Sequence, residues 1–408
     1  MIQTWAILVD SYRLLLAKKL FWATLAISAL VVLAFASIGF TEDGISIFFG
    51  VTTLEAPEFA KGTALSRALY VGIFTSFIVP IWLAWVATIL ALVSTTTIYP
   101  DFMSEGAIDV VLAKPLHRAK VFFVKYLGSL LFVFAQVGIF CVGVFFAIGF
   151  RLGEWNWMLF AAVPLITLFY SFLYCVNVLA GVLWRSGIAA LLVTMLFWFA
   201  LFIVQTSENA MVQITTQHRM EAESHDAWAA SLENRLERMR NPATFGERIA
   251  RTALTPEAQA ERIERLEADI ATARERAEDR RASAAGFEKW RGRIGAMMNV
   301  LPRTQGTIGL LERWLIPKGQ AGMLEVMMGG APPPPPPEPA QNDDPGLDVA
   351  PLELEAAPPR PSVDSYEVST RIQDELREIP AWRVLGPSLL FELFVLGLAC
   401  WIFVRRDF

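Results

Sequence analysis

The chain has 408 residues, of which 54% are hydrophobic and only 18% charged, with a formal net charge of −5. A soluble globular domain carries about 25% charged residues, so this composition argues against an ordinary soluble protein. Residues 1–206 and 384–404 are strongly apolar, whereas 207–382 is charged, alanine-rich and then proline-rich. We therefore expect a membrane domain with one large polar insertion.

Six apolar segments are long enough to cross the hydrocarbon core of a bilayer, which takes about 20 helical residues. They are residues 20–40, 69–97, 121–150, 157–184, 187–206 and 384–404. The first could instead be a signal peptide, because Lys18 and Lys19 precede it and Ala34-Phe35-Ala36 resembles a cleavage site. Its apolar run is longer than the roughly 7–15 residues of a signal-peptide core, which favours a membrane span.

Lysine and arginine residues near the span ends predict the orientation, because they are enriched in cytoplasmic loops. With the N-terminus inside, most of them are cytoplasmic: Arg13, Lys18, Lys19, Lys114, Arg118, Lys120, Lys125, Arg185, Arg405 and Arg406. Only Lys61, Arg67 and Arg151 fall in short outer loops. We expect a multi-pass protein of a bacterial inner membrane, with both termini cytoplasmic and residues 207–382 outside the cytoplasm.

A compact charged loop, residues 101–120, joins the second and third spans. A short helix is expected from 104 to 113, because Ser104 can cap it and Glu105 favours its positive end. Glu105 and Asp109 would line one face, and Ile108 and Leu112 another. Lys114-Pro115 would end the helix, since a residue before proline avoids the helical region. On this evidence alone, the helix could simply connect two spans.

The residue order in this loop resembles a known signature. It reads EGAIDVVLAKPLHR from Glu105 to Arg118, followed by KYLG from Lys125 to Gly128. The sequence resembles the signature loop of ABC-2 type transporter permeases, in particular those of nitrous-oxide-reductase maturation and gliding-type export systems. The resemblance covers the spans and this loop, about half of the chain. Such permeases usually have a short loop between the fifth and sixth spans, so the long insertion departs from the family pattern.

The resemblance implies a non-catalytic membrane subunit that pairs with a separate ABC-type ATPase. The loop would be the coupling helix that docks into the ATPase, with contacts from Glu105, Ile108, Asp109, Leu112, Lys114 and Arg118. Arg118 and Lys120 would also anchor the loop at the lipid headgroups. A second permease subunit, identical or related, is expected as well. The chain has no G-x-x-x-x-G-K-[ST] phosphate-binding loop, which fits an ATPase on another chain.

The insertion between the fifth and sixth spans, residues 207–330, reads as helical. Apolar residues recur at helical spacing in two runs: Leu232, Leu236 and Met239, then Ile263, Leu266 and Ile270. Asn241-Pro242 should end the first helix, and Thr255-Pro256 should begin the second. We expect 221–290 to form an antiparallel hairpin with a second arm of ~50 Å. It is either a solvated spacer or a docking surface for a periplasmic partner.

Two segments connect the hairpin to residues 384–408, which comprise the last span and the cytoplasmic C-terminus. In the first, Ile308, Leu311, Trp314 and Leu315 could share a face of a short helix. That helix would either lie on the outer membrane surface or pack against the outer ends of the spans. Residues 331–383 are a linker and return segment, and their run of prolines favours polyproline II or disorder.

Few residues are candidates for other chemistry. Neither H-E-x-x-H nor G-x-S-x-G occurs, and His117, His218 and His225 show no metal-binding spacing. The three cysteines, Cys141, Cys175 and Cys400, fall in predicted spans, so no disulfide framework is expected. No basic patch with interleaved aromatic residues indicates nucleic-acid binding. We therefore expect no catalytic residue, no metal and no cofactor.

Glu392 is the one ionisable residue well inside a predicted span. Carboxylates within a membrane are costly and usually face a cavity or a partner, so Glu392 is a candidate for the translocation path. Alternatively, it lies near the outer boundary, neutral or in reach of water. Pro80 and Pro164 are expected to kink the second and fourth spans.

Together these features predict an all-α polytopic membrane protein of six transmembrane helices with a large extracytoplasmic helical hairpin. The favoured function is the permease subunit of an ATP-driven exporter. One alternative is a membrane subunit that relays ATPase motion to a periplasmic partner without transport. A second is a polytopic membrane enzyme, which would need polar groups that converge within the spans. Beyond Glu392 the spans offer only scattered groups such as Gln136 and Asn177. The sequence leaves the substrate open.

Overall fold

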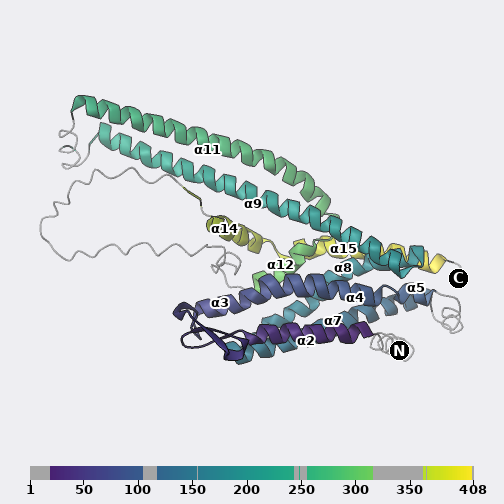
Figure 1. Cartoon of the computed structure of the whole chain (residues 1–408). Helices are drawn as coiled ribbons and strands as arrows, with labels where there is room; N and C mark the ends of the chain where they lie inside the picture. The colour runs from purple at the N-terminus through teal and green to yellow at the C-terminus, as the bar shows by residue number, and fades with distance from the viewer. Residues whose placement is uncertain are drawn as a thin grey trace. The chain divides into compact units, whose positions relative to one another are not determined.

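The computed structural model describes residues 19–103, 117–153, 155–242, 248, 255–315, 362–363 and 365–406. These residues are mostly helical (Figure 1). Internal contacts divide the chain into two compact units. The first comprises residues 1–206, 296–324 and 377–408, and the second comprises 207–295 and 325–376.

Six helical segments in the described part of the chain are long and apolar enough to cross a membrane. They are Lys19–Ser37, Leu65–Phe102, Arg118–Leu152, Trp157–Trp184, Gly187–Arg240 and Ala381–Arg405. The six apolar spans predicted from the sequence are therefore confirmed as helices. The fifth differs in length, because it continues well past the expected end at residue 206 as one helix of 54 residues.

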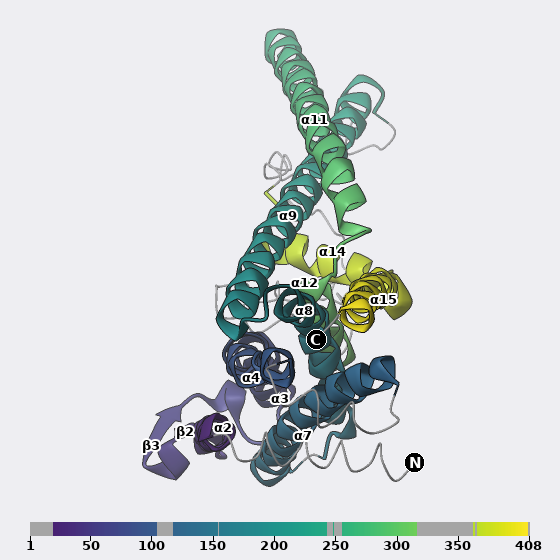
Figure 2. The same ribbon diagram turned by 90° about the vertical axis from the view of Figure 1, so that its right-hand side faces the viewer.

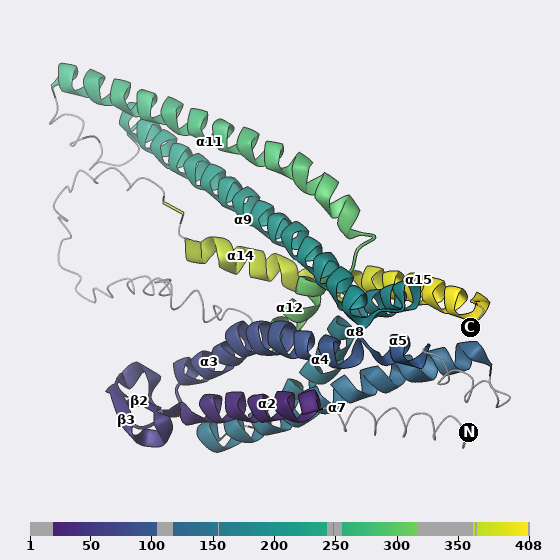
Figure 3. The same cartoon turned by 45° about the vertical axis from the view of Figure 1, so that its right-hand side comes forward.

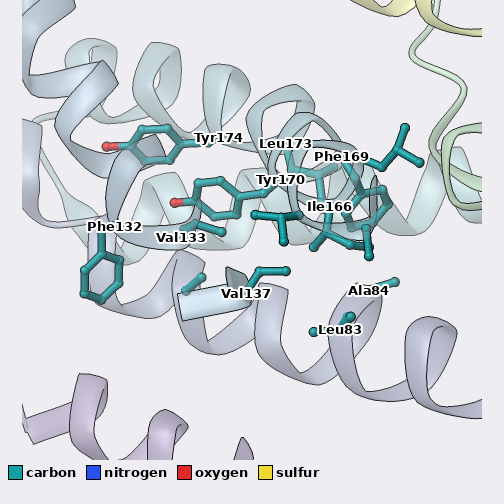
Figure 4. Close-up of a cluster of buried hydrophobic side chains, with 14 of the residues drawn as sticks. Leu83, Ala84, Phe132, Val133, Val137, Ile166, Phe169, Tyr170, Leu173 and Tyr174 are labelled. Atoms are coloured by element: carbon teal, nitrogen blue, oxygen red, sulfur yellow. The ribbon is translucent and has the colours of Figure 1, made fainter. Parts of the chain in front are cut away.

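The first unit is a bundle built around one central helix. Its elements are α2 (Lys19–Ser37), α3 (Ala64–Ile73), η3 (Phe74–Ala87), α4 (Thr88–Thr95), α5 (Ile98–Phe102), α7 (Arg118–Leu152), η4 (Trp157–Ala161), α8 (Ala162–Trp184), the start of α9 (Gly187–Arg240), α12 (Thr304–Leu315) and α15 (Ala381–Arg405). Helix α8 packs against α7, α12 and α15, and the end-on view in Figure 2 shows it among its neighbours. Its buried side chains, such as Phe169, Tyr170 and Leu173, form the middle of the apolar core (Figure 4).

The second span is assembled from four helical pieces rather than one regular helix. Its middle piece, η3, is a π-helix of 14 residues that contains Pro80. Proline has no backbone N–H to donate, so it disturbs the regular hydrogen-bonding pattern of an α-helix. The Thr88 hydroxyl donates to the Leu83 carbonyl oxygen at 3.0 Å and helps to satisfy the backbone there. Where a kink was expected, Pro80 lies within a π-helix.

Pro164 does not kink the fourth span, contrary to expectation. That span begins with η4, and Pro164 is the third residue of the following helix, α8. Proline is tolerated in the first turn of a helix, where backbone N–H groups have no intrahelical partner in any case. The span passes from η4 into α8 without leaving the helical region, since Ala161 and Ala162 both have right-handed helical backbone angles.

The loop between the first two spans carries a small antiparallel sheet that the all-α expectation did not include. Its strands are β1 (Gly39–Phe40), β2 (Gly44–Ile47) and β3 (Thr52–Glu55), in the order β1-β2-β3. Gly44 has φ +147°, and a Cβ atom there would lie 2.3 Å from the Leu54 carbonyl oxygen. Any side chain at position 44 would therefore collide with the backbone of β3 and displace that strand.

Helix α12 packs against the spans, which decides between the two arrangements that its sequence left open. The Gln205 amide donates to the Pro302 carbonyl oxygen at 3.1 Å, and its Oε1 accepts from the Gln305 N–H at 2.7 Å. The Ser388 hydroxyl on α15 accepts from the Arg303 N–H at 2.9 Å. Leu311 and Leu315 are buried as expected, whereas Trp314 is 40% exposed.

The second unit contains the predicted hairpin. Helix α9 ends at Arg240, and α11 (Pro256–Met298) begins one residue after Thr255, whose hydroxyl accepts from the Ala258 N–H at 3.3 Å. Both predicted helix ends are confirmed, and the two arms lie side by side (Figure 3). The second arm has 43 residues, so at 1.5 Å per residue it is about 64 Å long and exceeds the expected ~50 Å. The unit also contains most of α14 (Ser365–Glu378).

A narrow apolar seam and several ion pairs join the two arms. Leu232, Leu266 and Ile270 are buried together, and Trp228, Leu236 and Met239 pack against them. The ion pairs between the arms are Arg219–Glu288, Arg240–Glu267, Arg274–Glu233, Arg280–Glu221 and Arg281–Asp226. Exposed pairs of this kind contribute at most about 1 kcal/mol each, so the leucine and isoleucine contacts dominate.

The surroundings of His225 in the hairpin shift its pKa. Partial burial lowers its pKa below the ordinary value, and the neighbouring Arg276 and Arg280 lower it further. Glu221 and Asp226 oppose the shift without cancelling it. The neutral imidazole is therefore the form that the folded hairpin favours.

Candidate functional site

The central part of the predicted coupling loop lies outside the described residues. Glu105, Ile108, Asp109, Leu112 and Lys114 all fall within it, so their roles stay predictions. The structure does describe both flanks of the loop. Helix α5 ends at Phe102 on one side, and α7 begins at Arg118 on the other.

Arg118 fastens the second flank to the end of the last helix. Its guanidinium group donates to the carbonyl oxygens of Val404 at 3.4 Å and Arg406 at 3.0 Å. The last carbonyls of a helix have no intrahelical partner and carry partial negative charge, so a cation there is favourable. Arg406 in turn donates to the carbonyl oxygens of Val182, and of Leu183 at 3.2 Å, near the end of α8.

Aromatic side chains fasten the first flank to the same helix end. The Phe102 ring stacks on Phe403 of α15 with 6.1 Å between centroids, and the Lys125 ammonium lies 4.5 Å from the Phe102 centroid. Phe122 of α7 also contacts Phe403, at 5.6 Å. Together with Arg118 these residues form what we call the loop base, namely Phe102, Arg118, Phe122, Lys125 and Phe403. Both flanks of the loop thus contact the same helix, α15, one through hydrogen bonds and the other through aromatic stacking.

Glu392 lies further along α15, in the interior of the bundle. The residue is only 8% exposed, so its carboxyl group is enclosed by the neighbouring helices. The Tyr126 hydroxyl donates to Oε1 at 2.7 Å, and the Ser171 hydroxyl to Oε2 at 3.1 Å. The donors come from α7 and α8, so one carboxyl group joins three helices. No basic side chain forms an ion pair with it among the residues described.

A stack of tyrosines continues from this carboxyl group. Tyr126 stacks on Tyr174 with 5.4 Å between centroids, and Tyr174 stacks on Tyr170 at 5.3 Å. The hydroxyl of Tyr174 is bonded to Ser129 Oγ at 2.9 Å, and that of Tyr170 to Thr95 Oγ1 at 2.6 Å. Glu392 and the three tyrosines are therefore arranged as one connected set.

Among the described residues of the two predicted sites, α15 links Arg118 to Glu392. Glu392 and Val404 are 12 residues apart, which is about 18 Å along a helix. Sequence reasoning missed Tyr126, Ser171 and Phe403 as partners. The available signal for Tyr126 was its place in the KYLG segment, which the family resemblance had already marked.

Asn177 and His218, two of the other polar candidates, have structural partners. The Asn177 amide donates to Thr96 Oγ1 at 3.1 Å and to Thr194 Oγ1 at 3.2 Å, and so ties three spans together. His218 Nδ1 lies 3.2 Å from Arg280 Nη1. Within the described ranges, no three His, Cys, Asp or Glu side chains are grouped to hold a metal ion.

Comparison of the chain with models of known families, with curated proteins and with solved structures finds no match.

Proposed function

We propose that this chain is the permease subunit of an ABC-2 type transporter, driven as an exporter by a separate ATPase subunit. The observation that carries the proposal is the Glu105–Arg118 segment, whose residue order resembles the family's signature loop and which connects the second and third of six apolar helices. A second permease subunit completes the complex. In this proposal the membrane is a bacterial inner membrane, both termini are cytoplasmic and residues 207–382 are outside.

The loop base supports a route by which the loop could move the spans. Phe102 and Arg118, on either side of the loop, both contact the end of α15. A shift of the loop would therefore pull on α15 from two sides at once. Glu392 would pass that motion on to α7 and α8 through Tyr126 and Ser171. In this proposal the chain itself performs no covalent chemistry.

Copurification with a charge reversal tests the proposal. The chain is purified from its native membrane, and the proteins that accompany it are identified by mass spectrometry. An ATPase with a phosphate-binding loop should accompany the native chain and be lost from Asp109→Arg. The matched control is Asp43→Arg, the same charge change at an exposed carboxylate in the loop between the first two spans. Absence of any ATPase from the native preparation would contradict the proposal.

A second candidate function is the relay of ATPase motion to a periplasmic partner of 221–290. It is favoured by α9, which runs from the fifth span into the hairpin arm as one helix. Ala210→Pro would interrupt that helix, because proline removes a backbone hydrogen bond and clashes with the preceding turn. Loss of function with intact assembly in Ala210→Pro, but not in Ala210→Gly, would favour a relay over transport alone.

A further inference from the structure

A small, partly open cavity lies in the first unit where the π-helix meets α7 and α8. Its apolar lining includes Leu83, Val133, Val137 and Ile166, which Figure 4 shows facing one another from these helices. The volume available to the centre of a water molecule is about 10 Å³. That is about the room that one ordered water needs.

Three polar side chains line the same cavity. They are Ser28 from α2, Thr88 from α4 and Gln136 from α7. A buried water is held by two to four polar partners, so the number of polar groups is right for one molecule. A dry cavity in a protein core is usually lined by apolar groups alone.

Gln136 has a donor that the protein itself does not satisfy. Its side chain is 7% exposed, and its Nε2 atom is buried without a hydrogen-bond partner among the described residues. Buried amide groups nearly always have a partner, because leaving one unpaired costs its whole desolvation energy. The amide therefore needs an acceptor from outside the chain.

Thr88 is placed to receive a hydrogen bond from the same molecule. Its hydroxyl proton is used in the bond to the Leu83 carbonyl oxygen, which leaves the lone pairs of Oγ1 available. A water can accept from Gln136 Nε2 and donate to Thr88 Oγ1. A simple acceptor such as a carbonyl oxygen would satisfy Gln136 only.

The depth of the cavity argues against a lipid oxygen. Gln136 is 18 residues from the first residue of α7 and 16 from its last, so it lies near the middle of the span. The ester oxygens of lipids lie at the edges of the ~30 Å hydrocarbon core, about 15 Å away from its centre. Acyl chains, which do reach the centre, cannot accept a hydrogen bond.

We propose that this cavity is a binding site for one ordered water molecule, held between Gln136 of the third span and Thr88 of the second. The site does not depend on the transporter assignment. The water joins the two spans that flank the charged loop, next to the end of the π-helix, by a contact that can exchange. The second and third spans are thereby connected by a water-mediated contact in the middle of the membrane domain.

Radiolytic footprinting of the native chain in lipid nanodiscs tests for the water directly, because hydroxyl radicals formed from a bound water oxidise the side chains beside it. Phe140 lines the cavity, whereas Phe169 is equally buried in the core and is not part of the lining. Phe140 should be oxidised several times faster than Phe169. Equal rates for the two phenylalanines would overturn the proposal.

Gln136→Leu provides a second test. It should lower the Phe140 oxidation rate and reduce the melting temperature by about 2–4 °C, the shift expected when one hydrogen bond is lost. Asn177→Leu, which removes an amide with protein partners, should lower the melting temperature without changing Phe140 oxidation. If Gln136→Leu instead melts at a higher temperature, the amide is a dry, unsatisfied donor and the site is refuted. Should this variant not fold, the comparison of Phe140 with Phe169 in the native chain decides the question.

Discussion

Removing the Tyr126 hydroxyl isolates the energetic role of Glu392. Tyr126→Phe keeps the ring that stacks on Tyr174 and deletes only the donor 2.7 Å from Glu392 Oε1. A buried carboxyl group that loses a donor is left partly unsatisfied. The loss should destabilise the first unit by about 1–3 kcal/mol. For a domain of 150–250 residues this corresponds to a fall in melting temperature of roughly 2–4 °C per kcal/mol.

Tyr126→Phe should destabilise the first unit less when the Glu392 carboxyl group is absent. In a Glu392→Leu background the Tyr126 hydroxyl can turn to the Ser171 carbonyl oxygen, which lies 3.2 Å away. Tyr126→Phe then removes one ordinary hydrogen bond, worth about 0.5–1.5 kcal/mol. We therefore expect a coupling energy of about 0.5–1.5 kcal/mol between the two residues in a double-mutant cycle.

Thiol reactivity provides an assay that reports on the first unit alone. All three cysteines of the chain belong to this unit, and Cys141 and Cys175 are buried. A thiol-reactive fluorophore added during heating in detergent therefore reports the loss of its packing. Tyr174→Phe is the matched control, because its hydroxyl is bonded to Ser129 and should cost the same with or without the carboxyl group. An equal cost of Tyr126→Phe in both backgrounds would refute the reasoning.

Three further predictions concern the loop base and the hairpin. Arg118→Ala should raise the hydrogen-exchange rates of the last amides of α15 by about tenfold or more, since a hydrogen bond to a charged group is worth ~1.5–3 kcal/mol. Unchanged exchange rates would show that this hydrogen bond does not stabilise the end of α15. Because burial and two neighbouring arginines lower the pKa of His225, its protonation should destabilise the hairpin as the pH falls below about 6.5. His225→Gln should remove this loss of stability, so the variant should melt at a higher temperature than the native chain only in acid. A difference in melting temperature that is the same at all pH values would contradict the lowered pKa of His225. Leu232→Ala should destabilise the hairpin by about 2–4 kcal/mol, whereas Asp226→Asn should cost at most about 1 kcal/mol, as measured by hydrogen exchange of the two arms.

Features set by local sequence were predictable. The apolar spans follow from the length needed to cross a bilayer, and the hairpin ends follow from Asn241-Pro242 and from the Thr255 cap. The extent of α9 was also readable in principle, because no proline or glycine occurs from residue 188 to 240. The change from apolar to charged composition near residue 206 predicts the end of the span, but composition alone does not stop a helix.

Features set by packing were not predictable from one sequence. Tyr126 and Glu392 are 266 residues apart in the chain, and only the fold brings them together. The strands of the small sheet have two to four residues, too few to show an alternating pattern. The coupling roles of Glu105 and Asp109 came from a family resemblance, and they stay predictions because these residues lie outside the described part of the chain.

The π-helix lets the second span change its residue count without turning its far end. A π-helix takes up more residues per turn than an α-helix, so deleting one residue from Phe74–Ala87 would let that stretch relax towards regular α-helical geometry. In a regular α-helix the same deletion would rotate everything downstream by about 100°, the angle that one residue occupies. In the π-helix the closing of a wide turn offsets much of that rotation, so Tyr99, whose hydroxyl donates to the Phe122 carbonyl oxygen at 2.9 Å, can keep facing α7. The direction in which the second span enters the charged loop is thus buffered against the loss of a residue.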